Sequence, residues 1–470
     1  MKLFILVLSS FLAIAASAQN TSKLTGTWEG KIYAGVQIRV VFHFKDSLGN
    51  ITGSTDSPDQ GVKGIPCSHI ILRNDSLLLD VTTLRANYAG KFKNDSTITG
   101  QLIQGVSINL TLSKVVKVSA LTRPQTPQPP FPYISEDVEY DNAGKTLHYG
   151  ATITLPQGKG PFAAVLLITG SGAQNRDEEV FEHRPFAVIA DHLTRQGFVV
   201  LRVDDRGTGK SSGDFMGATT ADFATDVNTS LHYLKSRKEV DAKRLGMLGH
   251  SEGGMIAPMI ASQRNDIDFI ILLAAPGKKI PVLMEEQNVA LLKSSGFSKE
   301  AAEDYGKLYR NMIPGIIKAK STEEATTNLN NVVNEWKKNT PKDIVTATTG
   351  ISNEITQQQF INTFSASLTS PWFKYFLQFD PEPYLIKLHC KVLALNGDKD
   401  LQVSETNLDG INNTLKKSKS PAFDVKEMPG LNHLFQHCKK CTTNEYGELE
   451  ETFSQEALDI ISNWLNKNVK

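Results

Sequence analysis

The sequence predicts an α/β protein with a helical cap, preceded by a small all-β domain. Three observations support this fold class. Short alternating runs fill residues 24–118, continuous apolar runs separated by amphipathic stretches follow residue 138, and an aromatic-rich helical segment interrupts this later pattern at residues 278–385. Continuous apolar strands separated by helices are typical of a parallel sheet that helices cover on both faces. The chain has 470 residues, more than one core usually organises, so two or more domains are expected.

Residues 1–18 have the pattern of a cleaved signal peptide. Lys2 gives a positive start, an apolar run extends from Leu3 to Ala15, and Ala16-Ser17-Ala18 is a small-residue cleavage site before Gln19. An uncleaved anchor helix is the alternative, but the apolar run is shorter than the roughly 20 residues that span a bilayer. We therefore expect a secreted or periplasmic protein without a membrane span.

Residues 24–118 are expected to form a small antiparallel barrel or sandwich. Strand-like runs at Val36–Phe44, Ser76–Val81 and Ser107–Leu112 are separated by turn signals such as Leu48-Gly49-Asn50. Residues 119–134 form a linker, because five of the nine residues from Pro124 to Pro132 are proline and such a stretch favours an extended spacer. Residues 135–470 then form the α/β domain.

Within the α/β domain, five apolar runs are candidates for buried parallel strands. They are Phe162–Ile168, Phe198–Val203, Leu245–Leu248, Phe269–Ala275 and Val392–Leu395, with helices expected at Pro185–Arg195 and Thr220–Lys235. The helical segment at about 278–385 falls between the last two of these strands. A helical insertion in such a sheet usually caps the ligand site.

The balance of charges and the few cysteines give no reason to expect nucleic acid, an anionic membrane or a metal as partner. The chain has 50 Lys and Arg residues and 50 Asp and Glu residues, so net charge gives no reason to expect nucleic acid or an anionic membrane. Cys438 and Cys441 form a CxxC pair, which is compatible with a disulfide, a redox site or half of a zinc site. A disulfide fits an oxidising compartment best, because the sequence has neither a thioredoxin-like context nor a second close ligand pair. We expect no metal and no cofactor.

Gly249-His250-Ser251-Glu252-Gly253 predicts a nucleophilic serine. The motif follows the strand Leu245–Leu248 and precedes a candidate helix at Gly254–Ala261. In this context, G-x-S-x-G forms a sharp turn that exposes the serine hydroxyl, and the two glycines allow the strand and the helix to pack closely. The free N–H groups at the helix start then point toward the reacting oxygen. Ser251 is therefore the expected nucleophile.

A serine hydroxyl needs a base, and the base needs an acid that orients it. His389, His433 and His437 are the histidines that follow Ser251, and His433 lies just after the strand-like run Phe423–Val425, where a base belongs. Asp398 and Asp400 follow the preceding strand. The spacing G-x-x-D-x-x-V favours Asp400 as the acid, with Asp398 as a turn or cap residue.

Two loops supply candidate donors for an oxyanion. One donor is the backbone N–H of Glu252, the residue after the nucleophile, and the other should come from the loop after Ile168. That loop contains Ser171, the favoured donor, and Gly172, the second choice. The segment Asp205-Arg206-Gly207-Thr208-Gly209-Lys210-Ser211 lacks the spacing of a phosphate-binding loop, so we expect a structural loop there.

Together, these motifs resemble the serine-aminopeptidase-like and esterase branch of the α/β hydrolases. The resemblance rests on the run from Gly170 to Asp177, the Asp-Arg-Gly-Thr-Gly-Lys-Ser loop, Gly-His-Ser-Glu-Gly-Gly, Asn-Gly-Asp-Lys-Asp-Leu-Gln-Val and Leu-Asn-His-Leu-Phe-Gln. It is strongest to secreted bacterial members with an N-terminal β domain, and it implies an α/β-hydrolase fold with Ser251, Asp400 and His433 as triad. One departure is Thr169, which stands where a histidine usually precedes the oxyanion glycine.

Three functions follow from these observations. The leading hypothesis is a hydrolase of small carboxylic esters with short acyl chains. The second is a serine peptidase or aminopeptidase on small peptides. The third is a glycan- or lipid-binding protein whose hydrolase domain is inactive, although the intact triad argues against it. An aminopeptidase would need free carboxylates for a substrate ammonium. The acidic cap residues Glu285, Glu286, Glu300, Glu303 and Asp304 have instead the spacing of a solvated helix face. The oligomeric state is left open.

Overall fold

A computed structural model describes residues 22–33, 37–60, 62–119, 121–368 and 370–470 of the chain. The expected signal peptide and its cleavage site lie outside these residues. The chain divides into two compact units, of which the first comprises Met1–Thr122 with Val180–Glu182 and the second comprises Arg123–Glu179 with His183–Lys470.

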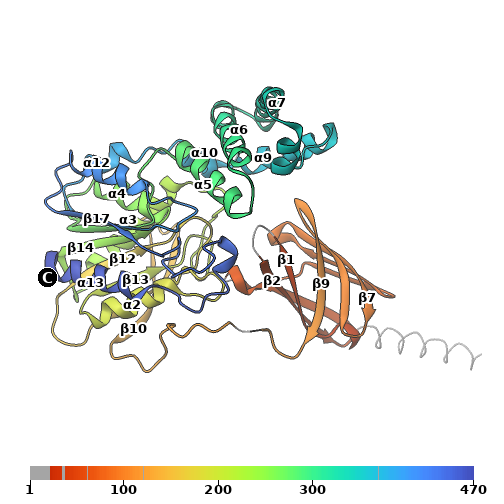
Figure 1. Ribbon diagram of the computed structural model, residues 1–470. Helices are drawn as coiled ribbons and strands as arrows, with labels where there is room; N and C mark the ends of the chain where they lie inside the picture. Colours follow the sequence, from red (N-terminus) through yellow and green to blue (C-terminus); the bar gives the residue numbers. More distant parts are fainter. Residues whose placement is uncertain (1–21, 34–36, 61, 120, 369) are drawn as a thin grey trace, which may run out of the picture. The chain divides into compact units, whose positions relative to one another are not determined.

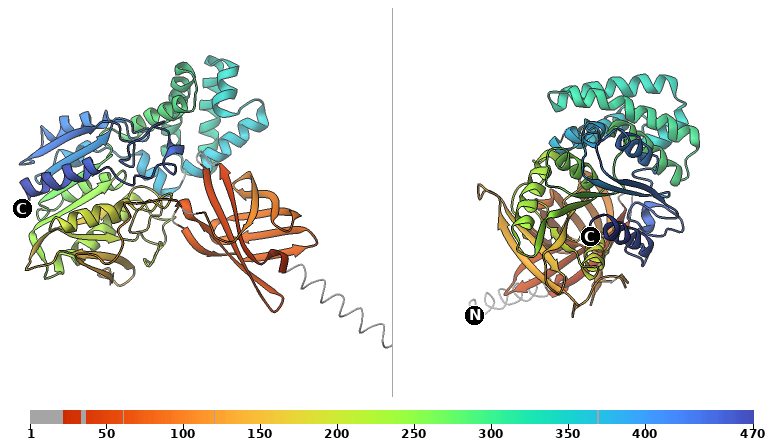
Figure 2. Two further views of the ribbon diagram at one scale, coloured as in Figure 1. Left: turned by 60° about the horizontal axis from the view of Figure 1, so that its bottom comes forward. Right: turned by 90° about the vertical axis from the view of Figure 1, so that its left-hand side faces the viewer.

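The first unit contains a single nine-stranded antiparallel sheet that curls strongly on itself (Figures 1 and 2). Its strand order is β4-β3-β2-β1-β9-β8-β7-β6-β5. The strands are β1 (Gly26–Tyr33), β2 (Gln37–Ser47), β3 (Asn50–Ser57), β4 (Val62–Pro66), β5 (His69–Arg73), β6 (Ser76–Val81), β7 (Ala86–Asn94), β8 (Thr97–Gln104) and β9 (Val106–Val115). Trp28, Phe42, Phe44 and Tyr88 are buried on the inner face. Of the two architectures expected from the sequence, the barrel describes this curled sheet better than the sandwich of two packed sheets does.

The second unit is built on an eight-stranded sheet of the order β10-β11-β13-β12-β14-β15-β16-β17. Its strands are β10 (Ile134–Asp141), β11 (His148–Leu155), β12 (Phe162–Ile168), β13 (Val199–Val203), β14 (Val240–His250), β15 (Phe269–Leu273), β16 (Lys391–Gly397) and β17 (Phe423–Met428). β11 runs antiparallel to its neighbours, and all pairs from β13 to β17 are parallel. The buried parallel strands explain the continuous apolar runs in the sequence.

Helices cover both faces of this sheet (Figure 1). One face packs against α3 (Thr220–Ser236), α4 (Gly253–Ala261) and α12 (Asn407–Leu415), and the other against α2 (Pro185–Arg195) and α13 (Gln455–Asn468). The α2 helix begins where Pro185 presets a helical φ and ends before Gly197, which has a φ of +87°. These layers fix the carboxyl ends of the parallel strands, where a site in such a sheet lies.

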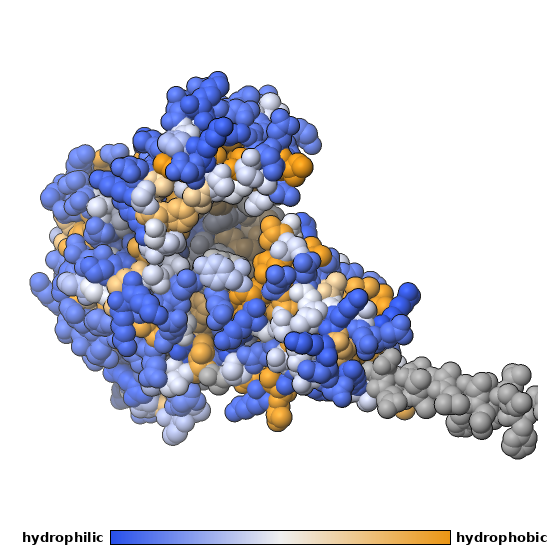
Figure 3. All heavy atoms as spheres, turned by 45° about the vertical axis from the view of Figure 1, so that its right-hand side comes forward, coloured by the Kyte–Doolittle hydropathy of each residue, from blue (hydrophilic) through white to orange (hydrophobic). Residues whose placement is uncertain are grey.

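The cap is inserted between the neighbouring strands β15 and β16. It consists of α5 (Ile280–Ser294), α6 (Lys299–Lys318), α7 (Thr322–Asn339), α8 (Lys342–Thr349), α9 (Glu354–Leu368), α10 (Pro371–Leu377) and α11 (Glu382–Leu385). Its outward surface in Figure 3 is largely hydrophilic. Its aromatic side chains pack together toward the sheet, including Trp372, Phe373 and Phe376 of α10.

Part of the proline-rich segment belongs to the second unit. Arg123 donates hydrogen bonds to the carbonyl oxygens of Gly447 and Leu449. The Gln125 side chain donates to Phe453 O and accepts the backbone N–H groups of Thr452 and Phe453. The segment from Arg123 onward is therefore fixed to the α/β unit rather than acting as a free spacer.

The described residues contain neither a membrane-spanning helix nor a metal-binding cluster. No helix among them has the length and apolar character needed to cross a membrane. No group of three or more histidine, cysteine or acidic side chains among them could hold a metal ion.

Candidate active site

Ser251 lies in a sharp turn between β14 and α4. Its backbone φ is +52°, a left-handed conformation that is uncommon for residues other than glycine. A Cβ at Gly249 would lie 2.1 Å from Gly253 O, and a Cβ at Gly253 would lie 2.2 Å from Ile168 O. Neither position can carry a side chain, so the two glycines of the motif are required by the packing of the turn. The turn presents Ser251 at the carboxyl end of the sheet.

The loops after β16 and β17 bring Asp400 and His433 together. His433 Nδ1 lies 2.7 Å from Asp400 Oδ2, and both side chains are buried. The second carboxylate oxygen of Asp400 accepts the backbone N–H groups of Gln402 and Val403 at 2.8 and 2.9 Å. Because the carboxylate fixes the proton on Nδ1, the neutral ring keeps Nε2 as its acceptor.

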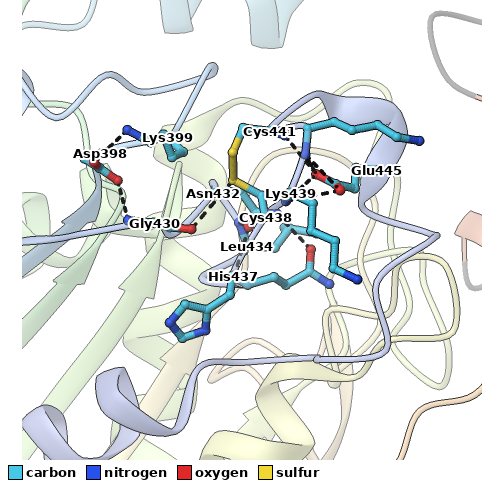
Figure 4. Close-up of a disulfide and its surroundings, with 12 residues drawn as sticks. Asp398, Lys399, Gly430, Asn432, Leu434, His437, Cys438, Lys439, Cys441 and Glu445 are labelled. Carbon is cyan, nitrogen blue, oxygen red and sulfur yellow. Dashed lines mark hydrogen bonds and ion pairs between the residues drawn. A yellow bond between two sulfur atoms is a disulfide. The ribbon is translucent and has the colours of Figure 1, made fainter.

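Asp398 has a different role. Its side chain accepts the backbone N–H of Gly430 at 2.6 Å and pairs with Lys399 at 2.8 Å (Figure 4). These contacts connect the turn after β16 to the turn after β17. Asp398 thus supports the loops, and the structure pairs Asp400, rather than Asp398, with His433.

The candidate oxyanion donors lie on the two expected loops. Among the described residues, the backbone N–H groups of Ser171 and Glu252 donate no hydrogen bond to another group of the chain. Ser171 lines the same cavity as Ser251, whereas Gly172 lines a neighbouring one. The Thr169 hydroxyl donates to Asp205 at 2.7 Å, and Asp205 also accepts the Gln174 N–H at 2.9 Å. Asp205 therefore fixes the loop that carries Ser171.

Ser251 lines a cavity of about 180 Å³ within the second unit. Most of its lining is apolar and comes from α5, α10 and the loops that follow β15 and β16: Pro276, Leu283, Met284, Trp372, Phe373, Phe376 and Val403. Gln287 and Gln402 contribute polar groups. Glu252 is the one carboxylate among the described lining residues. The cavity therefore suits a small apolar group bound next to the serine.

Glu252 connects three elements through its side chain. Its Oε1 accepts the Thr220 hydroxyl at 2.6 Å and the Trp372 indole N–H at 2.8 Å. The residue is 2% exposed, and burial raises the pKa of its carboxyl. The turn that holds Ser251 is thereby joined to the start of α3 and to the cap helix α10.

Two further buried groups lie beside the turn. The His250 ring contacts Glu178 Oε1 through Nδ1 at 2.9 Å and the carbonyl oxygen of His433 through Nε2 at 3.0 Å. Glu178 Oε1 also accepts the Gly170 N–H at 2.7 Å. The sequence motifs predicted no role for Glu178 or for the His250 side chain. Only the position of His250 within G-x-S-x-G, next to Ser251, marks it as part of the site.

The disulfide joins Cys438 and Cys441 in the loop that follows His433 (Figure 4). The Glu445 carboxylate accepts the backbone N–H groups of Lys439, Lys440 and Cys441 at 2.8–3.1 Å. A single carboxylate and a covalent bond thus fix this short loop.

The acidic side chains of the cap are largely paired within the protein. Glu285 pairs with Arg310 at 2.9 Å and Glu286 with Lys278 at 2.7 Å. Asp304 pairs with Lys307 at 3.0 Å, and Glu303 lies 3.8 Å from Lys299. None of these carboxylates lines the cavity at Ser251.

The sheet order, the strained serine turn and the capped carboxyl edge define an α/β-hydrolase domain, preceded by an all-β domain. Residues 182–348 match the family model described as serine aminopeptidase, S33. This match agrees with the resemblance expected from the motifs, and the second unit has the architecture of an α/β hydrolase.

Individual relatives match over shorter stretches. The chain is 34% identical over 165 residues to esterase EstD of Thermotoga maritima, which is 34% of this chain and 39% of EstD. It is 29% identical over 128 residues to cutinase est1 of Thermobifida alba, 26% of this chain and 38% of the cutinase. The aligned stretch thus spans less than half the length of each of these relatives. A structure of the Pyrococcus furiosus esterase Pf2001 is 14% identical, with a TM-score of 0.42, and the match covers 75% of this chain and 100% of that chain.

Proposed function

We propose that the protein hydrolyses small carboxylic esters through an acyl-enzyme intermediate on Ser251. The observation that carries this proposal is the placement of three groups at one edge of the sheet. Ser251 has a left-handed backbone conformation and lines the cavity, and His433 is hydrogen-bonded to the buried Asp400; these two residues lie on the loops after β17 and β16. A serine nucleophile needs a histidine base that a carboxylate orients, and the His433–Asp400 pair at the same edge supports the proposal.

Each group has one task in the proposed reaction. His433 Nε2 takes the Ser251 hydroxyl proton as the serine oxygen attacks the ester carbonyl. The Asp400 carboxylate stabilises the imidazolium that forms. The backbone N–H groups of Glu252 and Ser171 donate to the carbonyl oxygen as it becomes negative. His433 then protonates the departing alcohol. In the second half of the reaction, His433 deprotonates a water molecule that attacks the acyl carbonyl, and it returns that proton to the Ser251 oxygen as the acid leaves.

The cavity favours a short acyl chain. Leu283, Met284 and Phe376 leave about 180 Å³ in front of Ser251, and the Glu252–Trp372 contact fixes α10 over it. A long acyl chain would require these side chains to move. The lining offers apolar contact and two glutamine amides rather than a series of peptide-binding groups.

Ester substrates are favoured over aminopeptidase substrates. An aminopeptidase must hold a free ammonium, and four of the acidic cap residues already lie near or pair with lysine or arginine side chains. Glu252 lines the cavity, but Trp372 and Thr220 already occupy its Oε1. An amide leaving group also demands stricter proton transfer from His433 than an alcohol does.

A substrate panel tests this proposal. kcat/KM is measured for p-nitrophenyl acetate, butyrate and decanoate and for a set of aminoacyl p-nitroanilides. We expect acetate and butyrate to exceed decanoate, and every ester to exceed every anilide. A higher value on any anilide would overturn the ester proposal in favour of a peptidase, and a rise from acetate to decanoate would overturn the short-chain part.

We also propose that the protein is secreted or periplasmic and that a signal peptide is cleaved between Ala18 and Gln19. In residues 1–18 a basic residue is followed by an apolar run and then by small residues, which is the pattern of a signal peptide. The Cys438–Cys441 disulfide also suits an oxidising compartment. N-terminal sequencing of the mature protein should begin at Gln19. A mature chain that begins at Met1 would contradict the proposal.

A further inference from the structure

A buried ion pair lies where three loops of the candidate site meet. His250 is the last residue of β14, directly before Ser251, and Glu178 belongs to the loop after β12. The backbone carbonyl that His250 contacts belongs to His433. The His250 and Glu178 residues are 7% and 4% exposed. None of the steps proposed above uses either side chain.

The contacts of His250 determine its protonation. Nδ1 faces Glu178 Oε1 at 2.9 Å, and Nε2 faces the carbonyl oxygen of His433 at 3.0 Å. A carboxylate and a carbonyl oxygen only accept hydrogen bonds, so both ring nitrogens must donate. Opposite an ionised Glu178, His250 is therefore an imidazolium.

Glu178 extends this contact to the oxyanion loop. The same Oε1 accepts the backbone N–H of Gly170 at 2.7 Å, and a Cβ at Gly170 would lie 3.3 Å from the Cβ of Ser251. Glu178 itself has a φ of +52°, a strained backbone conformation that the surrounding structure must maintain. The Glu178 carboxylate thus fixes both Gly170, which precedes Ser171, and the imidazole ring of His250, which precedes Ser251.

We propose that the Glu178 carboxylate and the His250 imidazolium form a bracket that positions the Ser251 turn, the Ser171 loop and the His433 loop relative to one another. Both are positioning residues, because neither touches the reacting atoms. The inference rests on the proposed function, since the positioned groups are those of that reaction. The ligand cavity and the cap take no part in it.

The charges around His250 support the imidazolium. Burial lowers the pKa of His250, but Glu178, the carbonyl of His433 and Asp400 raise it more, so that it lies above its ordinary value. The His433 ring lies 4.8 Å away, centroid to centroid. Asp205 and Glu252 are acidic neighbours on the Glu178 side. Above the pKa of His250 one ring proton is lost, one of the two contacts fails, and activity should decline at alkaline pH.

A spectroscopic measurement tests the protonation directly. In the full chain labelled with ¹⁵N-histidine, His250 should give two protected ring N–H signals at pH 6.5, the ordinary pKa of a histidine ring. His183 is an internal control. His183 is also buried, and Thr452 can donate a hydrogen bond to its Nδ1. Burial is the main cause that lowers the pKa of its ring to about 4, so His183 should give one ring N–H signal. Signals are assigned with His250→Asn. A single ring N–H for His250 would overturn the bracket.

Kinetics test the positioning. Glu178→Gln keeps an acceptor for Gly170 but removes the charge, and we expect kcat to fall by about 10²-fold with little change in KM, as a misplaced site would show. The alkaline limb of the kcat profile should move to lower pH. Glu179→Gln is the matched control, because Glu179 is 7% exposed and contacts Arg184 and Asn175 instead. Equal effects of the two substitutions would overturn the positioning role.

The two proposals can fail separately. If a fluorophosphonate probe labels Ser251 while Glu178→Gln keeps wild-type kcat and pH profile, the bracket is wrong and the hydrolase proposal stands. If the probe fails to label the wild type, the hydrolase proposal is wrong, and the positioning role falls with it even where His250 shows two ring N–H signals.

Discussion

The indole Nε1 of Trp372 donates a hydrogen bond of 2.8 Å to Glu252 Oε1, and this bond joins cap helix α10 to the turn that holds Ser251. Trp372 also lines the cavity at Ser251 and stacks on Phe376 at 5.1 Å. The position of the cavity wall therefore depends on a residue of the G-x-S-x-G motif, which links the shape of the acyl site to the nucleophile turn.

Loss of this bond should loosen the cavity wall. Trp372→Phe keeps an aromatic ring but removes the donor, and an intramolecular hydrogen bond contributes about 0.5–1.5 kcal/mol. We expect KM for p-nitrophenyl butyrate to rise by about tenfold and the preference for short acyl chains to weaken. Trp336→Phe is the control, since Trp336 donates to Asp304 O within the cap. Unchanged KM and chain preference in Trp372→Phe would refute the role of the bond.

The raised pKa of Glu252 predicts a dependence of stability on pH. Burial raises this pKa above its ordinary value of 4.5, so the folded state binds the proton more tightly than the unfolded state does. The contribution of Glu252 to stability is thus full below pH 4.5 and is lost as pH rises through the raised pKa. Urea unfolding across this range should show the wild type declining relative to Glu252→Gln. A constant difference between the two proteins would show that Glu252 does not titrate in this way.

Triad substitutions should separate Asp400 from Asp398. Ser251→Ala and His433→Ala should each lower kcat by about 10³-fold or more, because triad members act as a unit. Asp400→Asn should cause a large loss, since the amide favours the wrong tautomer of His433. Asp398→Asn should have a much smaller effect, because Asp398 contacts Gly430 and Lys399. A greater loss in Asp398→Asn than in Asp400→Asn would reverse the assignment of the acid.

The disulfide should act locally rather than on global stability. A closed loop this short gains little entropy from cross-linking, so Cys438→Ser with Cys441→Ser should change the melting temperature slightly. The exposed Lys439 and Lys440 lie inside the loop, and trypsin should cleave there faster once the bond is removed. Free thiols at both positions in non-reduced digests of the wild type would contradict the pairing.

The hydrogen bonds of the linker predict a difference in stability between two truncated chains that contain the second unit. A chain of residues 135–470 loses the hydrogen bonds of Arg123 and Gln125 to residues 447–453 and that of Tyr133 to Asp191. A chain of residues 123–470 keeps them, and its unfolding free energy should be higher by about 2 kcal/mol or more. Both should retain esterase activity, since the triad lies beyond the linker. Equal stability of the two chains would show that the docked segment contributes nothing.

Local patterns predicted much of the second unit. The α2 helix was expected at Pro185–Arg195 and is found at those bounds, because a proline starts it and a glycine follows its end. The apolar runs marked the parallel strands, since strands buried on both faces carry little polar alternation. The glycines around Ser251 predicted the turn because their reason is steric and close in sequence.

Contacts between distant residues could not be predicted in this way. Glu178 lies 72 residues from His250, and Trp372 lies 120 residues from Glu252, so no local period marks either pair. The proline-rich segment was expected to be a spacer because proline stiffens a chain. Its docking depends instead on the side chains of Arg123 and Gln125, whose acceptors lie more than 300 residues later.

The central claim is that Ser251 is an activated nucleophile. Its most direct test is covalent labelling with a fluorophosphonate probe, followed by mass spectrometry of the labelled peptide. We predict one label on the wild-type chain, at Ser251, with none on Ser251→Ala and much slower labelling of His433→Ala. A wild-type chain that stays unlabelled, or a Ser251→Ala chain that labels at the wild-type rate, would contradict this assignment.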